Sequence, residues 1–112
     1  MMYVDFSAGA KVYKLRLTTR AVVALEKQLG CNPVSIFGDG DTIPTITTMV
    51  QILHASLQAY EHGIGMDDAF EIFDKWIADG NAMTDFVRII LDIFKVSGII
   101  KGGKATEENE KN

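Results

Sequence analysis

The two histidines and the single cysteine are the side chains in this sequence best suited to metal binding or nucleophilic attack. His54 and His62 are eight residues apart in a predicted helix, which puts them roughly 12 Å apart along its axis, too far to share one metal ion. Cys31 follows a predicted helix end, and the sequence places no base beside it. We therefore expect a structural thiol rather than an activated one.

Two acidic residues near the middle of the chain have the spacing that opens a calcium-binding loop. The sequence Asp39-Gly40-Asp41 fits the first three positions of such a loop. Ile43 and Pro44 then occupy the fifth and sixth positions, and Val50 occupies the twelfth. These side chains offer no oxygen ligand, so we predict a tight acidic turn.

A second acidic group could suggest a pair of carboxylates for acid–base catalysis. Asp67, Glu71 and Asp74 have helical spacing and fall on the solvent-facing side of an amphipathic segment, which favours a solvated face. The sequence Gly63-Ile64-Gly65 begins like a dinucleotide fingerprint, but it follows a predicted helix and lacks the third glycine. We predict no catalytic, cofactor-binding or metal-binding residues, and no enzymatic activity.

Composition and charge limit which partners and which cell compartment we expect for this protein. The 112 residues have a net charge of −4 and dispersed basic side chains, which argues against binding to nucleic acid. No apolar run approaches the roughly 20 residues of a membrane span, and the N-terminus does not resemble a signal peptide. We expect a cytoplasmic protein with no membrane partner, one globular domain over residues 1–100, and a polar disordered tail over residues 101–112.

The N-terminal pattern predicts a β-hairpin. Polar and apolar residues alternate over residues 3–7 and 11–17, with a turn at residues 8–10. The predicted inner face consists of Val4, Phe6, Tyr13, Leu15 and Leu17, and Lys11, Lys14 and Arg16 face mostly outward. Because a two-stranded hairpin is marginally stable in water, it must lie on helices.

Helical periodicity accounts for most of the remaining chain. We predict helices over residues 20–29, 44–62, 67–79 and 81–98, and a short turn over residues 32–37. Thr18 or Thr19 caps the first helix, and Gly30 ends it. The expected fold is α+β and mostly α, with the hairpin packed on a bundle of about four principal helices.

The last helix carries more apolar surface than one core requires. Taking about 100° per residue, Ile89, Ile90 and Ile93 fall within ~60° of Phe86, and further apolar residues widen this arc. Periodicity leaves two alternatives open: the helix is central in its own bundle, or it lies between this domain and a partner. For the second alternative, the residues assigned to the partner are Val87, Leu91, Phe94, Ile99 and Ile100.

The order of sequence blocks over residues 3–100 resembles a known family. The first block runs from a polar–apolar strand into a helix with an internal Leu25-Glu26, a Gly30 stop, an Asn32-Pro33 turn and residues 34–37. A long helix ending at residues 60–63, an acidic aromatic block at residues 67–76 and the apolar last helix follow. This pattern resembles the small tail assembly chaperones of long-tailed bacteriophages and of prophages of Gram-positive bacteria.

The resemblance implies a protein-binding role without catalysis. It implies a homo-oligomer in the bacterial host cytoplasm that coats the tape measure protein until subunits of the tail tube protein polymerise around it. The alternative is a structural virion component, such as a head–tail connector or a tail completion protein. A component remains in the finished particle, whereas a chaperone leaves it.

Overall fold

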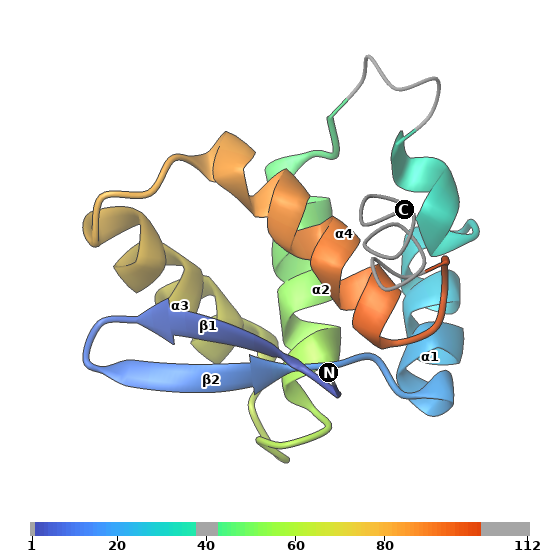
Figure 1. Cartoon of the computed structure of the whole chain (residues 1–112), viewed down its shortest axis with the longest axis horizontal. Coiled ribbons are helices and arrows are strands. Elements are labelled where there is room, and N and C mark those ends of the chain that lie inside the picture. The colour runs from blue at the N-terminus through green and yellow to red at the C-terminus, as the bar shows by residue number, and fades with distance from the viewer. Residues whose placement is uncertain (1, 38–42, 102–112) are drawn as a thin grey trace, which may run out of the picture.

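The computed structural model describes residues 2–37 and 43–101 (Figure 1). In chain order, the described elements are β1 (Val4–Ala8), β2 (Lys11–Leu15), α1 (Thr19–Leu29), the 3-10 turn η1 (Pro33–Phe37), α2 (Ile46–Leu57), α3 (Met66–Ala78), the 3-10 turn η2 (Met83–Asp85) and α4 (Phe86–Val96). The predicted α+β, mostly α fold with an N-terminal hairpin is confirmed. The predicted loop at residues 38–41 lies outside the described residues, and so does the predicted tail at residues 101–112 except for Lys101.

The hairpin forms with the predicted inner face, but its turn is Gly9-Ala10 rather than residues 8–10. Phe6 pairs with Tyr13, and both side chains lie on the buried face. Gly9 has a φ of 64° at the first of two turn positions, where a primed hairpin turn requires positive φ. The Gly9 N–H also donates to Asp79 Oδ2 at 2.8 Å, so the turn is attached to the end of α3.

The caps of α1 and η1 also follow the sequence. Thr18 Oγ1 accepts the N–H of Ala21 at 3.1 Å, as expected for a threonine cap. Gly30 adopts the left-handed conformation at φ 76° and ends the helix. Asn32 then starts η1, with its Oδ1 accepting the N–H of Val34 at 3.0 Å.

Two helices are shorter than predicted, because side chains after the end of α2 and before the start of α4 bond to the backbone. The α2 helix ends at Leu57 rather than His62, and Gln58 Nε2 donates to the carbonyls of His54 and Ile64 at 3.0 and 2.9 Å. Residues 81–85 do not belong to the last α-helix. Asn81 instead donates to Trp76 O at 2.8 Å, and Asp85 Oδ2 accepts the N–H of Ala82 at 2.9 Å.

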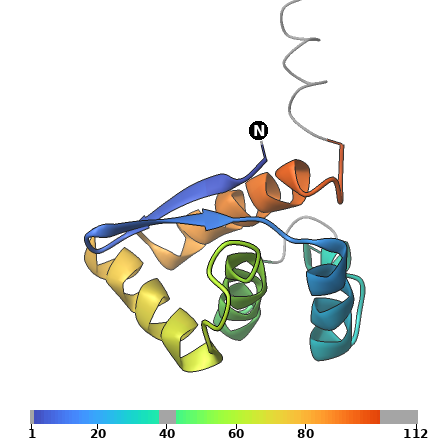
Figure 2. The same cartoon turned by 90° about the horizontal axis from the view of Figure 1, so that it is seen from below.

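The most enclosed helix is α2. Figure 2 shows α3, α2 and α1 side by side in that order, with the hairpin and α4 lying across them. Most residues of α2 are buried, from Met49 to Leu57, whereas α1 buries only Leu25. The centre of the bundle is therefore α2, and α4 packs on it through one face.

Four aromatic rings join the hairpin to α3 and α4. Phe86 is fully buried and lies 5.8 Å from Phe6, 5.3 Å from Phe73 and 5.6 Å from Trp76, measured between ring centroids. The three contacts are edge-to-face, which is a favourable arrangement of ring quadrupoles. This cluster supplies the helical support that the isolated hairpin lacks.

Arg16 was predicted to point mostly outward, but in the structure its hydrogen bonds connect it to α2, to the end of α4 and to the segment before β1. Its backbone N–H donates to Ser56 O at 2.9 Å. Its Nη1 donates to Val96 O at 2.8 Å and to Met2 O at 2.9 Å. A guanidinium at a helix C-terminus complements the helix dipole and satisfies a terminal carbonyl.

Phe86→Ala should lower the free energy of unfolding by about 3–5 kcal/mol, because it leaves a cavity among the other three rings. Urea denaturation followed by circular dichroism measures the change. Met83→Ala is the control, since Met83 is 43% exposed just before α4, and a small effect is expected. Equal losses in the two variants would contradict the central place of Phe86.

Arg16→Met should lower stability by about 1–3 kcal/mol, because it keeps the aliphatic stem but leaves the Val96 carbonyl without its charged donor. Hydrogen exchange at the end of α4 should accelerate in the same variant. Arg88→Met makes the same chemical change at an exposed position of α4 and should have little effect. Unchanged exchange in Arg16→Met would show that the bond to Val96 O does not hold the helix end.

Candidate protein-binding site

The side chains that could bind a metal or take part in catalysis are dispersed over the described part of the chain. Cys31 is exposed just after α1, and Asp67, Glu71 and Asp74 are exposed along α3. Among residues 2–37 and 43–101, no group of three His, Cys, Asp or Glu side chains could hold a metal ion. The predicted turn at Asp39 and Asp41 lies outside these residues.

The predicted partner surface is only partly on the outside of the molecule. Val87, Leu91, Ile99 and Ile100 are half-buried. Phe94 is fully buried and lies edge-to-face with Phe37 at 6.0 Å. Its assignment to a partner is therefore wrong for this chain.

The prediction for Phe94 was wrong because it placed the centre of the buried face of α4 at the wrong residue. The prediction centred the arc on Phe86, whereas the buried residues of α4 also include Ile90, Ile93 and Phe94. At about 100° per residue, the middle of this group lies near Ile90, and Phe94 falls within ~60° of it. Val87 and Leu91 lie further round the helix, at ~75° and ~115° from that middle.

The end of α4 extends the apolar surface beyond the helix. Gly98 adopts a φ of 79°, and its N–H donates to Lys95 O, while the N–H of Ile99 donates to Phe94 O at 2.9 Å. These bonds form a Schellman motif, which brings the residue after the glycine back against the last turn. Ile99 and Ile100 accordingly pack against the core while staying partly exposed.

Leu91 differs from its neighbours on this surface. Val87, Ile99 and Ile100 pack against the core cluster, but Leu91 is not among the half-buried residues that do so within the described ranges. We call these four residues, Val87, Leu91, Ile99 and Ile100, the α4 strip. A leucine that is half-buried without joining its own core is suited to contact another molecule.

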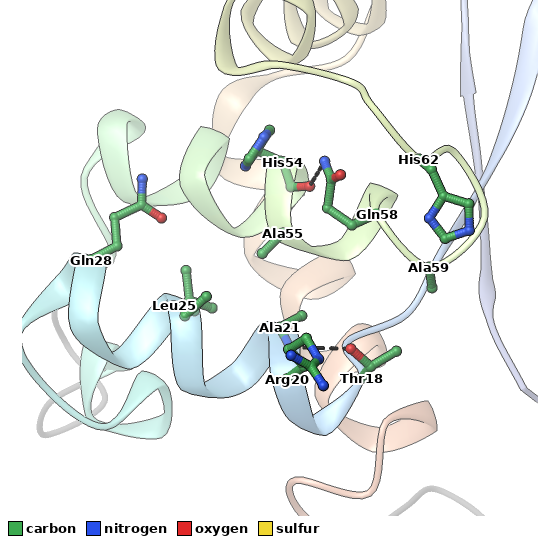
Figure 3. A pocket seen from close by; sticks show the side chains of 11 residues that line it. Thr18, Arg20, Ala21, Leu25, Gln28, His54, Ala55, Gln58, Ala59 and His62 are labelled. Atoms are coloured by element: carbon green, nitrogen blue, oxygen red, sulfur yellow. Dashed lines mark hydrogen bonds between the residues drawn. The ribbon is translucent and has the colours of Figure 1, made fainter.

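A second apolar surface, which the sequence analysis missed, lies between α1 and α2 (Figure 3). It is a groove of about 430 Å³. Its lining consists of Thr18, Arg20, Ala21, Ala24, Leu25, Gln28, His54, Ala55, Gln58, Ala59 and His62. This volume is within the range of binding pockets in proteins.

The groove exists because small residues face each other across the two helices. Ala21 and Ala24 lie on α1, and Ala55 and Ala59 lie on α2 or directly after it. Leu25 is the fully buried residue of α1, and the half-buried Val22 and Leu29 also pack against the core cluster. Alanine pairs in two predicted helices were visible in the sequence, but nothing there indicated that the helices would be adjacent.

The basic side chains in the lining of the groove are one arginine and two histidines, Arg20, His54 and His62. No carboxylate of the described residues belongs to this lining. The whole chain has a net charge of −4, so the groove differs in sign from the molecule around it. Both histidines belong to the lining of this groove.

None of the helices in the described part of the chain combines the length and the apolar character needed to cross a membrane.

The comparisons with known proteins identify a family but no function. Searches of curated proteins and of solved structures found no match to this chain. A family model described as a family of unknown function, DUF6096, matches residues 5–112, and the chain therefore belongs to that family.

Proposed function

We propose that this chain is a phage or prophage tail assembly chaperone, which self-associates and coats the tape measure protein before the tail tube polymerises. The proposal rests on the resemblance over residues 3–100 and on one observation in the structure. That observation is the α4 strip, in which Leu91 is half-buried without packing on the core cluster. The tape measure protein is expected to expose long amphipathic helices, which aggregate unless they are covered.

The shape of the α4 strip suits a helical partner. Val87 and Leu91 are four residues apart on one side of α4, and Ile99 and Ile100 continue the surface past the helix end. An amphipathic helix binds such a surface through apolar residues at positions i, i+3, i+4 and i+7. Because the strip is short, each contact is weak, and many copies along one rod would supply the affinity.

Weak repeated contacts also permit release. Each chaperone copy can dissociate singly when a tail tube subunit competes for the same segment, whereas one large interface would resist displacement. The proposed partners are thus the tape measure protein, further copies of this chain and the tail tube protein. The proposed site of action is the cytoplasm of the bacterial host, with no nucleic acid, membrane, cofactor or enzymatic step involved.

Leu91→Asp should abolish the ability of the chain to keep the tape measure protein soluble, because a charge in the α4 strip would be desolvated on binding. The test co-expresses the chain with the tape measure protein of the same genome and tags only the latter. Soluble tape measure protein should fall about tenfold or more. Circular dichroism should show that the variant remains folded.

Two variants serve as controls for this test. Met83→Asp changes another exposed apolar residue outside the α4 strip and should keep the partner soluble. Phe94→Asp changes a fully buried residue and should unfold the chain. Wild-type solubility of the partner with Leu91→Asp would reject the α4 strip as the contact surface.

Mass spectrometry of purified virions separates the chaperone from a structural virion component. A chaperone should be absent from finished particles, although it is abundant in the infected or induced cell. Stoichiometric amounts in the particle would overturn the chaperone proposal in favour of a connector or tail completion protein.

A further inference from the structure

We propose that copies of this chain associate by inserting one edge of α3 into the α1–α2 groove of the next copy. The proposal deepens the self-association within the proposed function and rests on it. Its two surfaces are different parts of the same molecule. The groove is open, and Phe70 is the exposed residue of the α3 edge, whereas Met66 and Ile77 beside it pack partly against the core cluster.

The edge of α3 that would enter the groove is apolar and flanked by acids. Phe70 is 44% exposed, and Met66 and Ile77 are half-buried beside it. At about 100° per residue, these three residues span only ~40° of the helix circumference. Asp67 and Asp74 lie within ~60° of Phe70 and are both exposed.

Phe70 differs from the other aromatic residues of α3 because it is exposed and lies on the acidic face of the helix. The other aromatic residues of this helix, Phe73 and Trp76, are buried in the ring cluster. Phe70 points away from that cluster, because it lies about 100° from the middle of the buried face. Aromatic side chains at this level of exposure are typical anchors of protein interfaces.

The groove has the complementary chemistry. Its floor of Leu25 and alanines offers apolar surface to a phenyl ring, and its volume of about 430 Å³ leaves room for neighbouring side chains. In the contact between copies, Arg20, His54 and His62 of the groove lining would lie near the carboxylates that flank Phe70. An apolar anchor with opposite charges around it would fix both the position and the orientation of the contact.

The contact has to form between different copies. Figure 2 shows α2 lying between α3 and α1, so Phe70 cannot reach the groove of its own chain. Because two different surfaces meet, each copy retains a free groove or a free α3 edge until a closed arrangement uses both. Several copies can therefore join, which suits a protein that covers a long partner.

Two variants, each blocking one side of the contact, test the proposal with pure protein. Phe70→Ser removes the anchor but keeps the groove, and Ala24→Trp fills the groove from an exposed position but keeps the α3 edge. Sedimentation equilibrium should show a mass that rises with concentration for the wild type. Each variant alone should associate with a Kd about tenfold or more above that of the wild type.

The mixture of the two variants gives the sharper result. It retains one intact groove and one intact α3 edge, so it should form a one-to-one complex and nothing larger. A monomeric wild type, unchanged association of either variant alone, or a mixture that stays monomeric would each overturn the proposal. Val23→Ser is the matched control, since it changes an exposed apolar residue of α1 outside the groove lining and should associate like the wild type.

A second measurement separates this contact from partner binding. Phe70→Ser should lose self-association but still bind a single tape measure segment through the α4 strip. If Ala24→Trp instead loses the tape measure segment and keeps self-association, the groove belongs to the partner and the proposal fails. The sedimentation assay contains only this chain, so it can succeed even if the tape measure protein is not the partner.

Discussion

Phe86 holds the fold together by placing one ring against Phe6, Phe73 and Trp76. These residues come from β1, α3 and the start of α4, and β1 is far from the two helices in the sequence. The hairpin could not persist in water without such support, and the rings add a direct contact between α3 and α4, which both also contact α2. Arg16 performs a similar role at the other end of α4 through polar bonds to Val96 and Met2.

These attachments determine which surfaces are left for other molecules. Once Phe86 and Phe94 face the core, Leu91 turns to the margin of α4 and Ile99 and Ile100 continue its apolar surface. On the far side of α2, the buried Leu25 and the half-buried Val22 and Leu29 attach α1 to the core, and facing alanines leave a groove. Large side chains thus pack the end of the bundle around Phe86, and small side chains leave the surface between α1 and α2 open.

The proposed surfaces would serve two different contacts, one with the helical partner and one between copies of this chain. The α4 strip is apolar along one helix margin and would cover exposed stripes of a helical partner. The groove is bordered by Arg20, His54 and His62, and the edge of α3 around Phe70 is bordered by acids. In this proposal, charge would distinguish contacts between copies from contacts with the partner, because a basic groove on a chain of net charge −4 attracts the acidic α3 edge of another copy.

The sequence by itself determined what depends on neighbours along the chain. The shared face of Phe6 and Tyr13, the Thr18 cap and the Gly30 stop follow from local preferences, so they were predictable. The tertiary structure decided the early end of α2, the burial of Phe94 and the groove. Each depends on contacts with another element, because the face of a helix that becomes buried is set by its neighbours in space rather than by its periodicity.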